Sequence, residues 1–151
     1  MAQQYFVLGI GGTGMRCIES LIHLCAMGMF DDTDIHLLAL DTDKDNGNFA
    51  RLKEVKEAYV KAKGTDASLR TALNETFFSA NINYYEFSPN YEVKSDFMSV
   101  FNYGDTKFNN PEQTAIADLV LTKNVETFNL RHGYRAQTHL GSMMMYHSIL
   151  E

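Results

Sequence analysis

The sequence predicts an α/β fold, a three-layer sandwich with a mainly parallel sheet and helices on both of its faces. Two nearly continuous apolar stretches, residues 4–9 and 35–40, are typical of parallel strands that are buried on both sides. A helical pattern over residues 13–27 lies between them, directly after a glycine-rich turn. This strand–helix–strand order predicts two parallel strands joined by a right-handed crossover.

The rest of the sequence gives helix boundaries and one further strand. Gly64 should end the helix that follows the second strand, and Asn110-Pro111 is a typical helix start. No repeat or linker divides the sequence, so we expect one domain over residues 1–151. The expected elements are helices over 48–63 and 66–78, a strand over 82–87, and helices over 95–102, 111–123 and 134–150.

Composition narrows the range of functions. The 151 residues are 45% hydrophobic and 21% charged, with a formal net charge of −6, so we expect no binding to nucleic acid or to an anionic membrane. No apolar stretch reaches the roughly 20 residues of a membrane span, and we find no signal peptide. Cys17 and Cys25 lie eight residues apart on one expected helix, about 12 Å, which is too far for a disulfide. We therefore expect a cytoplasmic protein.

The glycine-rich turn carries the strongest functional signal. Gly9-Ile10-Gly11-Gly12-Thr13-Gly14 fits the pattern G-x-G-x-x-G between a strand and a helix, so the βαβ unit is Rossmann-like. Backbone N–H groups at a helix start have no internal partner, and the helix dipole adds positive charge there. Gly9, Gly11, Gly12, Thr13 and Gly14 are therefore predicted to hold a phosphate. The alternative is a tight turn that serves only the packing of helix on sheet.

The second apolar strand ends in acidic residues. Asp41, Thr42 and Asp43 follow it directly, and we expect them to contact a nucleotide. Two carboxylates at a strand end suit a Mg²⁺–phosphate site, so Asp41 and Asp43 are the predicted metal contacts. A dinucleotide fold would place an acid about 20 residues past the glycines, whereas Asp41 comes 27 residues after Gly14. The alternative is a solvated loop with helix-capping acids.

The segments "LGIGGTGMRCIESLI" and "IHLLALDTD" together resemble the N-terminal nucleotide-binding half of the tubulin and FtsZ superfamily. Within that superfamily it looks more like the bacterial tubulin-like proteins that carry a G-G-T-G turn. The resemblance implies GTP or GDP with Mg²⁺, phosphates held by residues 11–14, and a metal beside residues 41–43. "RHGYRAQTHLGSMMMYHSILE" is similar to the loop and helix before the superfamily's fourth core strand, which would bring Gly133 and Arg135 near the phosphate loop.

The sequence departs from that superfamily in three places. The second glycine loop, G-G-G-T-G-T-G, is absent, as are the loop of catalytic acids and the helix that reads guanine. We therefore expect an incomplete tubulin-like domain, either the N-terminal fragment of a longer protein or a shortened relative. By resemblance, the full-length protein would be a GTPase that assembles head to tail, so the expected partners are a nucleotide and either further copies or the missing C-terminal part. This chain alone should hydrolyse nothing.

Two other functions fit the sequence. One is a Rossmann-type enzyme that binds NAD or ATP, such as a ubiquitin-activating-like adenylyltransferase. Those adenylyltransferases follow a G-x-G-G-x-G turn with an acid-x-acid strand end and a downstream Asn and Arg. Asp41, Asp43, Asn48 and Arg51 loosely fit this pattern. The missing zinc cysteines and catalytic region count against it. The other is a non-catalytic interaction module that keeps the fold without the ligand.

Overall fold

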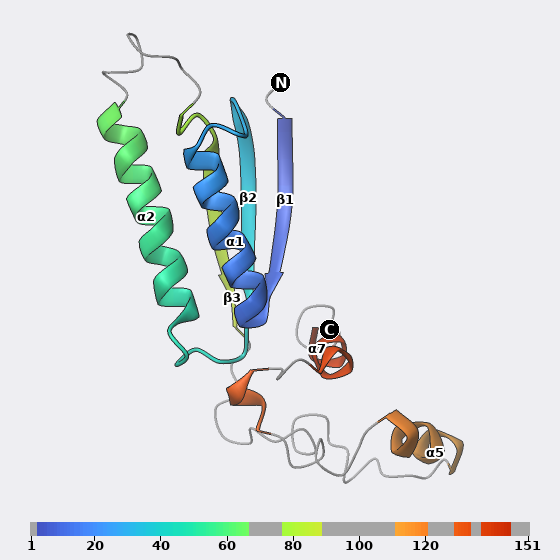
Figure 1. Ribbon diagram of the computed structural model, residues 1–151. Coiled ribbons are helices and arrows are strands. Elements are labelled where there is room, and N and C mark those ends of the chain that lie inside the picture. The colour runs from blue at the N-terminus through green and yellow to red at the C-terminus, as the bar shows by residue number, and fades with distance from the viewer. Residues whose placement is uncertain (1–2, 67–76, 89–110, 121–128, 134–136, 146–151) are drawn as a thin grey trace. The chain divides into compact units, whose positions relative to one another are not determined.

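The computed structural model describes residues 3–66, 77–88, 111–120, 129–133 and 137–145. The chain divides into two compact units, residues 1–88 and 89–151. The first unit is a three-stranded parallel sheet with two helices, which confirms the α/β class and the βαβ start (Figure 1). Its elements in order are β1 (Gln3–Ile10), α1 (Gly11–Ala26), β2 (Thr33–Leu40), α2 (Asn48–Asp66) and β3 (Asn81–Phe87).

The register brings the carboxyl ends of all three strands to one edge of the sheet. The strand order is β1-β2-β3, with Ile10 opposite Leu40 and Leu40 opposite Phe87. Because α1 follows β1 without a loop and α2 follows β2 after seven residues, both helices begin at this carboxyl edge. In open α/β sheets this edge is where ligands bind.

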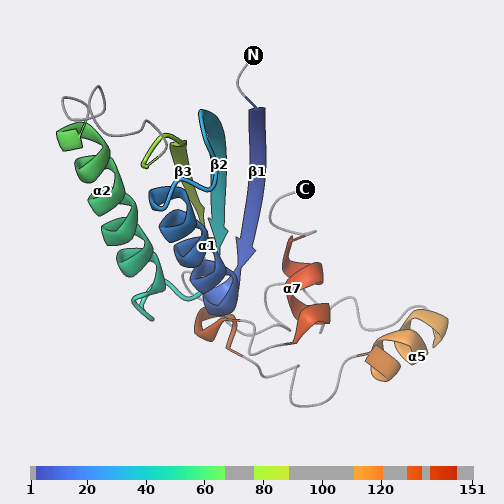
Figure 2. The same cartoon turned by 45° about the horizontal axis from the view of Figure 1, so that its top comes forward.

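Both helices cover the same face of the sheet (Figures 1 and 2). This agrees with the right-handed crossover expected of two successive βαβ units. Apolar side chains of α1 and α2 pack on alternate residues of β2, which points these residues toward the helices. The fully buried members of this core include Met15, Ile18, Ile22, Ile35, Leu37 and Leu52.

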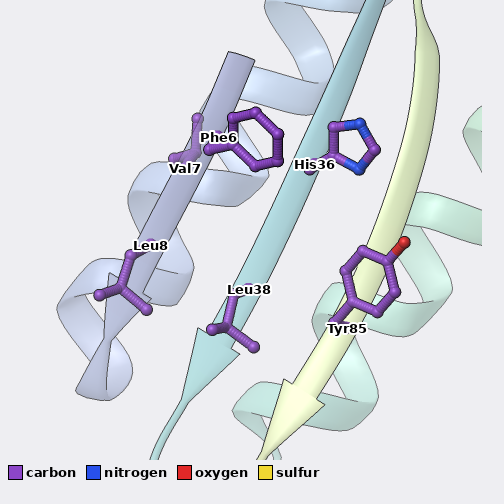
Figure 3. Close-up of a pocket in the computed structure, with 6 residues that line it drawn as sticks. All are labelled: Phe6, Val7, Leu8, His36, Leu38 and Tyr85. Atoms are coloured by element: carbon purple, nitrogen blue, oxygen red, sulfur yellow. The ribbon is translucent and has the colours of Figure 1, made fainter. Parts of the chain in front are cut away.

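The other face of the sheet carries exposed apolar side chains. Phe6, Leu8 and Tyr85 are 76%, 47% and 54% exposed, and Figure 3 shows them with His36 and Leu38 on the side away from the helices. A helix layer on this face is part of the three-layer sandwich that the sequence predicts. The helices that the structure describes in the first unit lie on the opposite face, so the three-layer arrangement stays a prediction.

Helix boundaries in the first unit differ from the sequence prediction. α1 begins at Gly11 instead of residue 13, so the glycine turn itself forms the first helical turn. Gly11 enters the helix with a positive φ of 67°, which glycine adopts without strain. The prediction that Gly64 ends the next helix is wrong, since α2 continues to Asp66. Tyr59 and Lys63 explain this: the Tyr59 hydroxyl and the Lys63 ammonium both donate to the carbonyl of Ala80, at 2.8 Å, and hold the end of the helix against the start of β3.

The expected helix over 66–78 falls mostly on residues 67–76, which lie outside the described part of the chain. Its last two residues form a turn instead, in which Phe78 has a φ of 56°. The predicted strand over 82–87 is confirmed as β3, which begins one residue earlier.

The second unit holds short helical elements. The predicted helix from residue 111 is confirmed as α5 (Pro111–Val120), and the last predicted helix is present as α7 (Thr138–Met145). Gln137 is not helical, and residues 134–136 lie outside the described part of the chain. The 3-10 helix η1 (Leu130–His132) was not expected. The expected helix over 95–102 and the ends of the other two, at 121–123 and 146–150, lie outside the described residues. Among the helices that the structure describes, none has the length and apolar character to cross a membrane.

Candidate functional site

The start of α1 lies uncapped at the carboxyl edge of the sheet. Ile10 precedes the helix in an extended conformation, with φ −106° and ψ 124°, and its apolar side chain makes no capping hydrogen bond. The first turn, Gly11–Gly14, contains no acidic residue. The first four N–H groups of a helix have no partner within it. This end of α1 therefore presents donors and the positive end of a helix dipole to whatever lies beyond it.

Gly9 and Gly14 are glycines because strand and helix touch there. A Cβ on Gly14 would lie 2.7 Å from the carbonyl carbon of Gly9, and a Cβ on Gly9 would lie 2.9 Å from the Gly14 oxygen. Real Cβ atoms do not approach backbone atoms this closely. These two glycines therefore serve the packing of α1 on β1, which is the role that the alternative interpretation gave to the whole turn.

Gly12 faces a side chain instead of backbone. A Cβ at this position would lie 2.7 Å from Nδ2 of Asn48, the first residue of α2. The beginnings of α1 and α2 are therefore close neighbours at the carboxyl edge. Their two positive helix ends lie side by side, which favours an anion there.

The acidic loop after β2 is ordered by its own side chains. Asp41 is 1% exposed; its Oδ1 accepts from the Asp43 N–H at 3.2 Å, and its Oδ2 accepts from Asn46 Nδ2 at 3.2 Å. Asp43 in turn accepts from the Asp45 N–H at 3.0 Å. The buried carboxylate of Asp41 thus holds the loop together through these hydrogen bonds, whereas the half-buried Asp43 is the more accessible carboxylate.

Thr42 lies between these two acids and is 4% exposed. Its hydroxyl oxygen is buried and has no hydrogen-bonding partner in the described part of the chain. Buried polar groups in native structures nearly always have a partner, whether protein, water or ligand. Thr42 is therefore a polar group at the carboxyl edge whose requirement is not met by the residues that the structure describes.

An ion pair joins α1 to α2 farther along the helices from the carboxyl edge. The Nε of Arg51 on α2 donates to Oε1 of Glu19 on α1, and Glu19 is only 8% exposed. Glu19 is the ninth residue of α1, about 12 Å along the helix axis from Gly11. The pair therefore fixes α1 against α2 and keeps the Arg51 Nε away from the glycine turn.

A pocket of 400 Å³ lies on the opposite, helix-free face of the sheet (Figure 3). The His36 ring stacks on Phe6, with ring centroids 4.7 Å apart, and is nearly parallel to Tyr85. The other lining residues are Val7, Leu8 and Leu38, so the lining is mostly apolar, with the His36 ring and the Tyr85 hydroxyl as its polar groups.

The structure brings together the predicted residues of the first unit. Gly9, Gly11, Gly12, Thr13 and Gly14 line the β1–α1 junction, and Asp41, Thr42 and Asp43 follow the neighbouring strand at the same edge. Gly133 belongs to the second unit, where it is buried and ends η1 with a φ of 74°. Arg135 lies outside the described residues. The roles assigned to Gly133 and Arg135 stay predictions.

Asn46 at this edge and Glu19, farther along α1, were missed by the sequence reasoning, which considered Asn48 and Arg51 only under the adenylyltransferase alternative. Both missed roles depend on contacts between elements, and Glu19 looks like an ordinary helix surface residue in the sequence. Among the described residues, no group of three or more His, Cys, Asp or Glu side chains is placed to hold a metal ion.

Comparison of the chain with protein families, with curated proteins and with solved structures finds no match. The resemblance to the tubulin and FtsZ superfamily therefore stays a prediction that rests on residues 5–43 of the sequence.

Proposed function

We propose that the first unit binds a nucleotide as its Mg²⁺ complex, with the phosphates at the start of α1. The observation that carries this proposal is the uncapped first turn of α1, built from glycines at the carboxyl edge of a parallel sheet. A turn without side chains allows a phosphate to approach the free N–H groups. Packing accounts for Gly9 and Gly14, but it does not require the start of α1 to lack a cap.

The acidic loop supports a metal complex over a bare anion. Asp41 and Asp43 follow directly at the same edge, and two carboxylates would repel an uncompensated triphosphate. Mg²⁺ removes that repulsion and typically takes only one or two protein carboxylates, keeping several waters. We assign the metal or water contact to Asp43, because both oxygens of Asp41 already accept hydrogen bonds within the loop.

The resemblance favours GTP over the adenine nucleotides. A dinucleotide fold uses an accessible acid at the end of the second strand for the ribose, and Asp41 is 1% exposed with both oxygens engaged. In the adenylyltransferase alternative Arg51 would belong to the site, but its Nε is paired with Glu19 about two turns away from the glycine turn. Assembly into filaments and GTP hydrolysis would belong to a full-length protein and are inferred from the resemblance alone.

Titration calorimetry tests the proposal. The whole chain is titrated with GTP, ATP and NAD, each with and without Mg²⁺. We expect GTP to bind only with Mg²⁺, and Gly12→Val to abolish binding because its side chain blocks the turn. Gly64→Ala, on an open part of α2, is the control and should bind as the wild type does.

Binding of ATP or NAD in preference to GTP would refute the tubulin-like assignment. An absence of binding for all three ligands would refute nucleotide binding and leave the interaction-module alternative.

A further inference from the structure

Asn48 is a half-buried residue whose side-chain amide has no hydrogen-bonding partner in the described part of the chain. Its position is nevertheless well defined. Its Nδ2 lies 2.7 Å from the place that a Cβ on Gly12 would occupy, so the amide stands beside the first turn of α1. An amide offers two N–H donors and one acceptor oxygen. Here a donor group lies next to the free backbone N–H groups of the glycine turn.

Two sets of contacts hold Asn48 in this place without using its side chain. Its backbone N–H donates to Oδ1 of Asn46 at 2.9 Å, and Asn46 is itself tied to the buried Asp41. One helical turn later, Arg51 pairs with the buried Glu19 of α1. The start of α2 is thus anchored to the strand end and to α1, while the amide of Asn48 is left available. A binding group that is fixed in advance loses little entropy when a ligand arrives.

We propose that Asn48 is a phosphate-binding residue, whose Nδ2 donates to a non-bridging phosphate oxygen of the nucleotide held by the α1 turn. This inference rests on the proposed nucleotide function and adds a ligand contact from α2 to it. The ligand is then bound jointly by two helix starts, α1 through its backbone and α2 through a side chain. A neutral amide suits this place, because Mg²⁺ carries the compensating charge.

Introducing a negative charge at the contact gives the sharpest test. Asn48→Asp keeps the size of the side chain and replaces the donor with a carboxylate that repels phosphate. An acid at the first position of a helix is favourable, so we expect this variant to fold as well as the wild type. We expect its dissociation constant for Mg·GTP to rise by about tenfold or more, the range of a hydrogen bond to a charged group. Asn48→Ala should lose less, because it removes the donor without adding repulsion.

Asn83→Asp provides a matched control. Asn83 is exposed on β3, four residues before the end of the strand, about 13 Å from the carboxyl edge. The same change in charge there should leave the affinity unchanged. Circular dichroism of all three variants confirms that they are folded.

Nuclear magnetic resonance adds a direct readout. The side-chain ¹H–¹⁵N signals of Asn48 should shift on addition of Mg·GTP and also of Mg·pyrophosphate, which carries no base. A wild type that binds Mg·GTP while Asn48→Asp binds equally well, or while the Asn48 signals stay in place, overturns the role of Asn48 and leaves the proposed function intact. A wild type that binds no nucleotide overturns both.

Discussion

Alanine at position 14 should destabilise the protein although Gly14 lies in a helix, where alanine is normally favoured. The new Cβ would lie 2.7 Å from the Gly9 carbonyl carbon and 2.9 Å from its Cα, both of them backbone atoms. Ordinary van der Waals contact begins at 3.4 Å, so strand and helix must separate. Neither partner has a flexible side chain that could move aside.

The size of the effect follows from two opposing terms. Overpacking of a well-packed contact costs about 1–3 kcal/mol, and a contact between two backbones belongs at the upper end. Replacing a helical glycine by alanine gains up to about 1 kcal/mol. We therefore expect Gly14→Ala to lower the free energy of unfolding by about 2 kcal/mol.

Gly64→Ala is the matched control, because Gly64 is also helical and a Cβ there has nothing within 4 Å. This variant should gain about 0.5–1 kcal/mol. Urea denaturation followed by far-ultraviolet circular dichroism measures both variants. If Gly14→Ala is as stable as the wild type while Gly64→Ala gains stability, the close approach of β1 and α1 is not the reason for the glycine.

Three further predictions concern α1 and its contacts. Arg51→Ala should cost about 1–3 kcal/mol of unfolding free energy in urea titrations, because it leaves the Glu19 carboxylate buried without its partner; adding Glu19→Gln should recover part of this loss. Native protein should react with one equivalent of a thiol reagent, at the exposed Cys17, and with two only after unfolding. Burial raises the pKa of the Cys25 thiol to about 11, so unfolding free energy should be unaffected by this group below about pH 8.5 and fall toward pH 11, a slope that Cys25→Ala should reduce.

The elements of the first unit could be predicted because their signals are local. The apolar runs of β1 and β2 and the helical spacing of Ile18, Leu21, Ile22 and Cys25 lie within single segments. The G-x-G-x-x-G pattern likewise placed the turn correctly, between a strand and a helix. Each of these features is fixed by neighbours in the sequence.

The remaining features depend on contacts between segments. Gly64 carries an ordinary stop signal, which the anchoring of Lys63 and Tyr59 by residues near β3 overrides. The pairing of Glu19 with Arg51 joins residues 32 positions apart. The burial of Asp41 follows from the loop that closes over it, which no periodic pattern reveals. The sequence thus identified the edge of the sheet that carries the candidate site, but not how its side chains are held there.

The loop after β2 also bears on the chemical durability of the chain. Asn46 precedes Gly47, which has a φ of 76° and no side chain to hinder attack of its nitrogen on the Asn46 amide. Such attack releases ammonia and is one reason that asparagine is a heat-labile residue. In the closed loop both ends of that amide are engaged, by Asp41 and by the Asn48 N–H, which restrains it from the reactive orientation. The rate of deamidation at Asn46, measured by mass spectrometry as a gain of one mass unit, would therefore report how often this loop opens.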